Sequence, residues 1–182
     1  MKRKTLFDPD NELGKALTLW WEKLQGKGEF EGKAQTADRA ELSRAQTVTD
    51  VILLPSFQRA CFQFKPLLQR RGESEWEKSI DRLAIILALL ARVRENSSES
   101  LPILMASAKG EKPLLSELRF RRLIQRDRDA LFGAMIRVLQ VLGNKANIHD
   151  LADDIYYWGD NVKRQWAFTY FPALPTANSK PT

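Results

Sequence analysis

Apolar residues recur every three or four positions through most of the chain, which is the period of an amphipathic helix. Residues 11–25, NELGKALTLWWEKLQ, show this spacing clearly. Their apolar stripe contains Leu13, Leu17, Trp20, Trp21 and Leu24. Residues 150–171 repeat the pattern with Leu151, Ile155, Trp158, Val162 and Trp166. No stretch alternates with the period of two that is typical of strands. The pattern predicts an all-α fold, with these tryptophans packed in its core.

The middle of the chain predicts shorter helices and one central helix. A loop over residues 26–35 contains three glycines, and Thr36 is the expected N-cap of a short helix that runs to about Ala45. Pro55 should kink or divide the next helical stretch. Ser74 should cap a long helix over residues 75–94, whose segment IILALL is apolar nearly all round. We therefore expect this helix at the centre of a bundle.

Residues 116–142 are predicted to form one helix, which Ser116 caps and Gly143–Asn144 ends. We predict two small helical bundles packed together. The expected divisions are an N-terminal bundle at 1–95, a linker region at 96–115, a C-terminal bundle at 116–171 and a disordered tail at 172–182.

The start of the 116–142 helix, SELRFRRLIQRDR, contains five arginines in thirteen residues. At 100° per residue, Arg119, Arg122, Arg126 and Arg137 fall on one face of a single helix, as a stripe about 27 Å long. Only Asp129 among the acids lies near this stripe, whereas Asp127 projects into the apolar face. We interpret Asp127 as a buried partner for an arginine or for backbone donors, and the stripe as a row of phosphate contacts.

Further cations lie on other predicted helices. Arg39 and Arg44 share the helix that starts at Thr36, where the intervening Glu41 should weaken the patch. Lys163 and Arg164 lie on the last helix. Arginine predominates over lysine, which suits bidentate phosphate contacts. The candidate nucleic-acid-binding residues are Arg39, Arg44, Arg119, Arg122, Arg126, Lys163 and Arg164.

Composition narrows the class of protein. The 182 residues carry 29 Lys and Arg against 23 Asp and Glu, a formal charge of +6, which favours an anionic partner only modestly. Cys61 is the single cysteine and has apolar neighbours, so we expect a buried, inert thiol and a reducing compartment. The longest apolar run is about half of a membrane span. We therefore expect a soluble, cytoplasmic protein without a membrane partner.

Catalytic patterns are missing from the sequence. It contains no P-loop, GxGxxG, nucleophile elbow or HExxH motif. His149 is the single histidine and is interpreted as a capping or surface residue, and Asp153 and Asp154 as helix-start or surface charges. We predict no catalytic residue, no metal site and no cofactor, and conclude that the chemistry of this chain is binding.

Four stretches in order resemble the CasB family, the small subunit of the type I-E CRISPR complex Cascade. SELRFRRLIQRDRDAL is similar to the family's arginine-rich signature, and RAELSRA followed by LLPSFQRA to a second pattern. The ending DIYYWGDNVKRQWAFTYF is similar to the family's closing segment, and the first tryptophan helix is also in place. Ser43, Asp160 and Asn161 depart from positions where the family often has basic residues.

The resemblance implies a non-enzymatic, all-helical protein of two bundles. Two copies would line the inside of the complex, beside the subunits that hold the guide RNA (crRNA). Their basic faces would help to hold the guide–target duplex region and the displaced DNA strand without reading sequence. The expected partners are crRNA, target DNA, other Cascade subunits and a second copy of this chain.

Two alternatives remain open from the residues. The chain could be a helical scaffold whose arginines bind an acidic protein. It could also be a free-standing DNA-binding regulator, because LGNKANIHDLADDIYYW allows a helix-turn-helix. However, the second helix of that segment offers few exposed polar side chains for reading bases.

Overall fold

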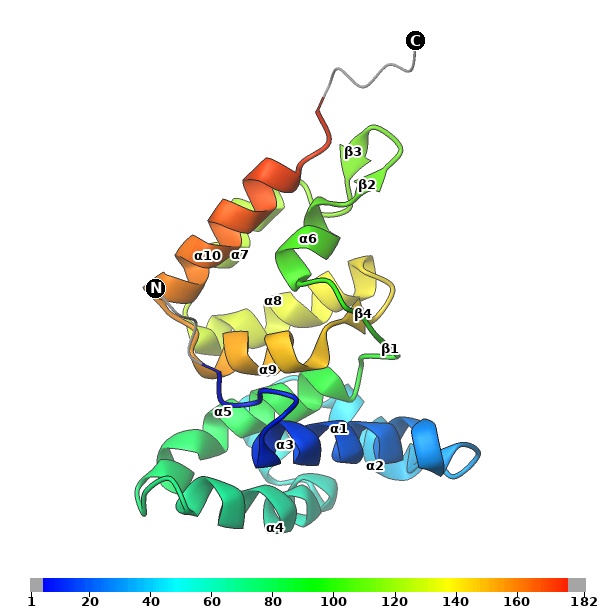
Figure 1. Ribbon diagram of the computed structural model, residues 1–182, viewed down its shortest axis with the longest axis vertical. Coiled ribbons are helices and arrows are strands. Elements are labelled where there is room, and N and C mark those ends of the chain that lie inside the picture. The colour runs from blue at the N-terminus through cyan, green and yellow to red at the C-terminus, as the bar shows by residue number, and fades with distance from the viewer. Residues whose placement is uncertain (1–4, 177–182) are drawn as a thin grey trace.

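The computed structural model describes residues 5–176 and is built almost entirely of helices (Figure 1), which confirms the all-α prediction. The α-helices are α1 (Glu12–Gln25), α2 (Thr36–Arg44), α3 (Val48–Ile52), α4 (Pro55–Gln69), α5 (Glu75–Leu90), α6 (Leu101–Ala106), α7 (Glu117–Ile124), α8 (Arg128–Val141), α9 (Ile148–Tyr156) and α10 (Asp160–Tyr170). The shorter elements are the 3-10 turns η1 (Gly28–Phe30) and η2 (Phe171–Ala173) and the strands β1 (Glu95–Asn96), β2 (Ala108–Lys109), β3 (Lys112–Pro113) and β4 (Lys145–Ala146). β1 pairs with β4 in parallel, and β2 with β3 as an antiparallel hairpin.

α5 lies at the centre of the molecule, as its apolar surface predicted. Residues 84–90 are fully buried. α5 packs against α3 and α4 in the lower bundle of Figure 1 and against α8 and α9 in the upper one. Buried side chains from both bundles join in one continuous core. The division of the chain at residues 96–115 stays a prediction, and this segment contains α6 and the β2–β3 hairpin.

Several local predictions are confirmed. Pro55 divides its helical stretch into α3 and α4, since it is the first residue of α4. The side chain of Ser116 accepts a hydrogen bond from the backbone N–H of Arg119 and caps α7. α8 ends before Gly143 and Asn144, which both have positive φ. Two expected capping bonds are absent: Thr36 is the first residue of α2 and not its cap, and Ser74 precedes α5 without a side-chain capping bond.

The prediction of one helix over residues 116–142 is wrong. α7 ends at Ile124, and α8 starts at Arg128 after a break that includes Asp127. Asp127 has extended backbone angles, and its carboxylate accepts a hydrogen bond from the N–H of Ala130 at 2.8 Å. It is therefore the exposed N-cap of α8 and not a buried residue on an apolar face, although it does serve a backbone donor as expected.

A second break divides the last helical stretch into α9 and α10, and the two breaks are joined by hydrogen bonds. Arg128 donates to the carbonyl oxygens of Ile155, Tyr156 and Trp158, at 3.0, 3.2 and 3.2 Å. In the opposite direction, the indole N–H of Trp158 donates to the carbonyl of Arg126 at 2.9 Å. Backbone carbonyls that a helix end leaves without partners are thus satisfied from the other break.

α7 is also anchored on α10. The ring of Phe120 stacks on Tyr170 with a centroid distance of 3.8 Å, and the Tyr170 hydroxyl donates to the carbonyl of Leu115 at 2.6 Å. Burial raises the pKa of Tyr170 to about 12, so this hydroxyl keeps its proton. These contacts of Tyr170 hold α7 and the chain segment before it against α10.

The acidic and histidine residues of α9 have structural roles that differ from the predicted ones. Asp153 and Asp154 are buried, so their interpretation as surface charges is wrong. Asp153 accepts hydrogen bonds from the N–H groups of Leu6 and Phe7, and Asp154 from the indole of Trp166. Asn147 caps α9, whereas the half-buried His149 donates from Nδ1 to the carbonyl of Phe7.

The core predictions for tryptophans and cysteine are confirmed. Trp20, Trp21, Trp158 and Trp166 are buried, as is Cys61. Within residues 5–176, no helix has the length and apolarity to cross a bilayer. In the predicted tail, η2 continues the chain after α10, and Leu174 packs against the core. The predicted disorder of residues 177–182 lies outside the described residues.

The N-cap of α8 can be tested by substitution. Asp127→Ala should lower the free energy of unfolding by about 1 kcal/mol, because the N–H of Ala130 loses its acceptor. Asp127→Asn is the matched control, since asparagine caps helices about as well. Urea unfolding followed by circular dichroism measures both. Equal losses in the two variants would contradict the capping role.

Cys61 should react slowly in the folded protein. Burial raises the pKa of its thiol to about 11, so about one thiol in a thousand is ionised at pH 8. Labelling by Ellman's reagent should be slow in the native protein, accelerate about tenfold per pH unit between pH 8 and 10, and become rapid in urea. Rapid labelling of the native protein at pH 7 would disprove this assignment.

Candidate nucleic-acid interface

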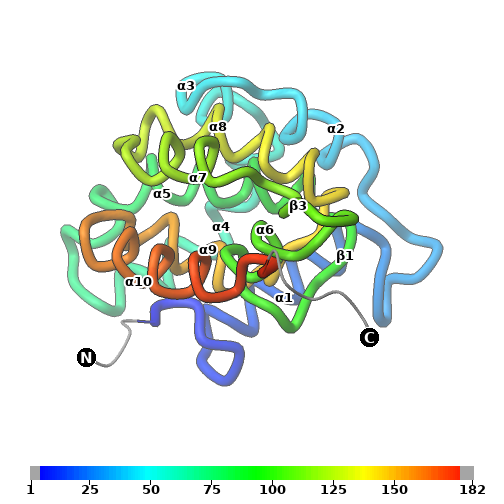
Figure 2. Tube along the Cα trace, turned by 90° about the horizontal axis from the view of Figure 1, so that it is seen from above, coloured from blue at the N-terminus to red at the C-terminus, as the bar shows by residue number. Residues whose placement is uncertain are grey.

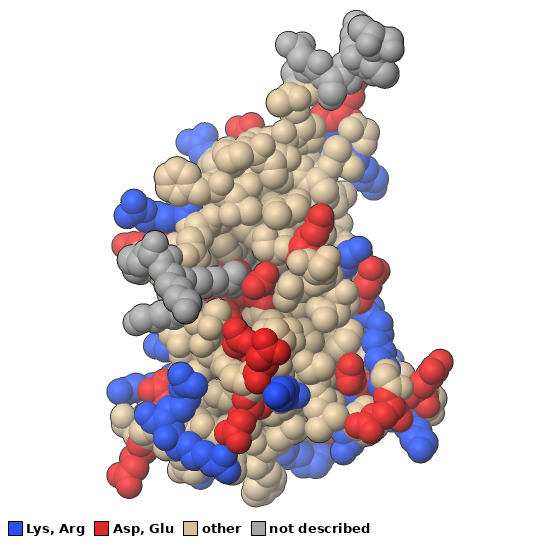
Figure 3. Space-filling model, viewed as in Figure 1, with Lys and Arg blue, Asp and Glu red and all other residues tan. Residues whose placement is uncertain are grey.

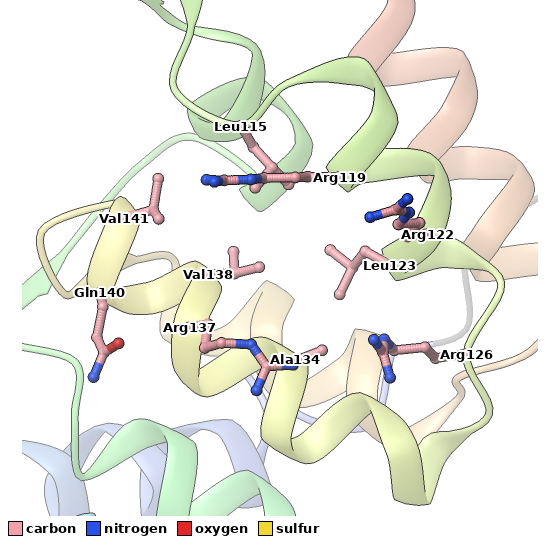
Figure 4. Close-up of a pocket in the computed structure, with 10 residues that line it drawn as sticks. All are labelled: Leu115, Arg119, Arg122, Leu123, Arg126, Ala134, Arg137, Val138, Gln140 and Val141. Carbon is pink, nitrogen blue, oxygen red and sulfur yellow. The ribbon is translucent and has the colours of Figure 1, made fainter.

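The break between α7 and α8 opens a groove of about 630 Å³ between these two helices. Figure 4 shows Arg119, Arg122 and Arg126 along one rim and Arg137 reaching toward Arg126 from the other. The floor between the rims is apolar. It contains Leu115, Leu123, Ala134, Val138 and Val141, with Gln140 at one end. We call this feature the four-arginine groove.

The four-arginine groove replaces the predicted linear stripe. Arg119, Arg122 and Arg126 are brought together as the sequence predicted, but α7 and α8 present them and Arg137 from two directions. Arg137 was placed on the stripe but not among the candidate contacts. The rest of the lining was not predicted, because it depends on the angle between two helices. A local signal for the break was present, since aspartate is a preferred N-cap.

The groove arginines lack acidic partners within residues 5–176. The ion pairs of the described chain involve Arg59, Arg70 and Lys145 instead. Asp129, the acid expected near the stripe, is not among the residues that line the groove. Four guanidinium groups around an apolar floor repel one another, so an anion in the groove would relieve this repulsion. Each guanidinium also offers donors suited to two oxygens of a phosphate.

Two other arginines, Arg128 and Arg92, stabilise the fold by donating to backbone carbonyls. Arg128 is held by three carbonyls, and burial, followed by the charge of Arg82, lowers its pKa. Arg92 is buried and donates to the carbonyls of Ala88 and Ala45, both at 2.7 Å. Burial lowers the pKa of Arg92 to about 10. Arg92 and Arg128 therefore differ from the groove arginines in two ways: they donate to backbone carbonyls, and burial lowers their pKa values.

The acids of α2 interact with an arginine of α4. Asp38 forms an ion pair with Arg59 of α4 at 2.6 Å, and the half-buried Glu41 adds to the charge that raises the pKa of Arg59. Arg44 is exposed, and Arg39 is half-buried. One carboxylate oxygen of Glu41 is buried without a hydrogen-bond partner among the described residues, and the expectation that Glu41 weakens the basic patch stays a prediction. Figure 2 shows α2 and α3 on the same side of the molecule as α8, opposite α1, α9 and α10.

Lys163 and Arg164 lie on α10, away from α2. The ammonium of Lys163 lies 5.8 Å from the ring centre of Trp158, whose indole in turn donates to Arg126. Lys163 is thus near the Arg126 end of the groove. Arg164 is exposed, and its side chain forms no hydrogen bond or ion pair with residues 5–176. Figure 3 shows the side of the molecule with α10 and α1, where the surface over α10 and α6 carries few charges.

A family model described as "CRISPR-associated protein Cse2" matches residues 38–171. The chain belongs to the Cse2 family. All seven candidate residues and the entire four-arginine groove of this Cse2 protein lie within the matched region. A sequence comparison with curated proteins gives no match.

Solved structures share the Cse2 fold. One is a chain in the crystal structure of E. coli Cascade bound to a PAM-containing dsDNA target, with a TM-score of 0.64 and 18% identity. The alignment covers 90% of this chain and 99% of that one. Another is CasB from Thermus thermophilus, with a TM-score of 0.61, 24% identity and coverage of 88% and 98%. At these identities the likeness shows the fold, so the site must be argued from the residues of this chain.

The contrast between the groove arginines and Arg128 predicts unequal effects of substitution on stability. Arg128→Gln should lower the free energy of unfolding by about 1–3 kcal/mol, because three carbonyls lose a charged donor. Arg122→Gln should change it by less than about 0.5 kcal/mol, because it removes only a repelling charge. Urea denaturation of both variants measures the difference. A large loss for Arg122→Gln would mean that the groove arginines support the fold.

Proposed function

We propose that this Cse2 protein is a non-catalytic subunit of a crRNA-guided Cascade complex that binds nucleic acid through phosphate contacts, independently of sequence. The observation that carries the proposal is the four-arginine groove, with four guanidinium groups and no acidic partner among the described residues. The match to a chain of a DNA-bound Cascade structure supports the same assembly.

The chemistry of the groove suits a backbone more than base edges. Arginine guanidinium groups bind phosphate oxygens of any nucleotide, whereas base reading needs side chains arranged within a DNA groove. The apolar floor adds contact area without hydrogen-bonding specificity. In an RNA-guided complex, base pairing reads the sequence, and a few phosphate contacts suffice to shift the nearly balanced exchange of strands. We propose that the contacts stabilise the guide–target duplex and the displaced strand.

The other candidate residues extend this interface. Arg39 and Arg44 lie on α2, on the same side of the molecule as α8, and Lys163 lies near the Arg126 end of the groove. We propose Arg119, Arg122 and Arg126 as the main contacts, with these three and Arg164 as additional ones. The remaining proposed partners are the other Cascade subunits and a second copy of the chain.

The regulator alternative has little structural support. α9 would be the recognition helix of the helix-turn-helix, but residues 151–156 of this helix are all buried. A recognition helix must present its side chains to base edges in the major groove. The scaffold alternative, in which the groove binds an acidic peptide, is distinguished by comparing the affinity for such a peptide with the affinity for nucleic acid.

Charge reversal in the groove tests the proposal. Arg119→Glu/Arg122→Glu should weaken binding to single-stranded DNA, duplex DNA and RNA of mixed sequence about equally. The slope of log K against log salt should flatten by about one for each lost phosphate contact. Fluorescence anisotropy between about 50 and 300 mM salt measures both quantities.

The matched control is Arg71→Glu/Arg121→Glu, which changes the net charge equally at exposed positions outside the groove. Its salt slope should stay close to that of the unmodified protein. Equal effects of the two double variants, or loss confined to one sequence, would refute the proposed contacts. Binding of an acidic peptide to the groove, with no measurable nucleic-acid affinity, would favour the scaffold alternative.

A further inference from the structure

Arg94 lies where the ends of α1, α5 and α8 meet, and hydrogen bonds hold both its backbone and its side chain. Its backbone N–H donates to the carbonyl of Asn144, just after α8, at 2.8 Å. Its guanidinium Nη1 donates to Oε1 of Gln25, at the end of α1, at 2.9 Å. The amide of Gln25 is itself fixed, because Nε2 donates to the carbonyl of Ala91 at 3.1 Å. Arg94 remains exposed, so most of its five N–H donors stay available.

α2, which carries Arg39, is tied to the same junction at both of its ends. The backbone of Gln35 donates to the carbonyl of Lys23, which ties the start of α2 to the end of α1. The guanidinium of Arg92 donates to the carbonyl of Ala45, which ties the end of α2 to the end of α5. Arg39 lies between these two attachments. Burial lowers the pKa of Arg94, and the positive charge of Arg39 adds to this effect.

This pair has no carboxylate partner in the described part of the chain. Glu95, the nearest acid in sequence to Arg94, forms an ion pair with Lys145 at 2.9 Å. Asp38, beside Arg39 in sequence, is paired with Arg59. Two adjacent cations are unfavourable in isolation, but two guanidinium groups held together can grip one tetrahedral oxyanion. The carbonyl-rich ends of α1 and α5 help to keep Arg94 in place without an acid.

We propose that Arg39 and Arg94 form a second phosphate-binding site, which takes a phosphodiester of the same strand that occupies the four-arginine groove. The inference rests on the proposed function and adds Arg94, which neither the sequence pattern nor the groove identified. α8 connects the two sites, because Arg137 and Gln140 line the groove and Asn144 just beyond the helix holds Arg94. The 14 residues of α8 extend about 21 Å, the length of about six phosphates along one strand.

The test compares Arg94→Gln and Arg39→Gln with Arg71→Gln in the full-length protein. Arg71 lies before α5 and Arg94 after it, so these positions are about 24 Å apart along a 16-residue helix. Each variant removes one positive charge. Arg94→Gln and Arg39→Gln should each weaken binding of a mixed-sequence 20-nucleotide strand about tenfold and reduce its salt slope by about 0.7, the value for one single-strand phosphate. Arg71→Gln should change neither quantity.

Stability separates a binding role from a structural one. Arg39→Gln removes no hydrogen bond found in the described chain, so its urea midpoint should be unchanged while its salt slope falls. Salt slopes of Arg94→Gln and Arg39→Gln equal to that of Arg71→Gln would overturn the second site and leave the proposed function intact. Absence of salt-dependent binding by the unmodified protein would overturn both. Loss of slope in these two variants, with unchanged folding, supports the second site.

Discussion

The structure depends on reciprocal hydrogen bonds between two helix breaks. Arg128 donates to three carbonyls at the end of α9, and Trp158 donates back to the carbonyl of Arg126 after α7. Each break supplies donors for carbonyls that the other leaves open. Because these bonds fix both breaks, α7 leaves the axis of α8 and packs on α10 through Phe120 and Tyr170. The space that opens between α7 and α8 is the four-arginine groove.

Arginine has two roles in this protein. Some arginines hold the fold together, others are left to bind a ligand, and the surroundings of each side chain decide its role. Arg92 and Arg128 donate to backbone carbonyls, and burial lowers their pKa values. The groove arginines have neither carbonyls nor carboxylates around them among the described residues, so their charge is available to a ligand. A modest net charge of +6 thus conceals local concentrations of positive charge. For a phosphate-binding protein, this distribution matters more than the total.

The Cse2 assignment and the site support each other through different observations. The family model covers residues 38–171, and the solved structures share the fold at 18% and 24% identity. Such identities do not transfer contacts from one protein to another. The groove and the ion pair of Asp38 with Arg59 come from this chain's own geometry. The contacts that we propose for an extended anionic ligand lie on the side of the molecule that carries α2 and α8.

The sequence by itself determined the all-α fold, the central α5, the Ser116 cap and the set of arginines, because these depend on local periodicity and on residue type. It predicted one helix where α7 and α8 lie, since the apolar period continues across the short break at Asp127. Only the tertiary structure decided the angle between these helices, the ion pair of Asp38 with Arg59, and the bonds that tie α2 to the ends of α1 and α5. Each of these joins residues from separate helices, and helix periodicity carries no information about such distant contacts.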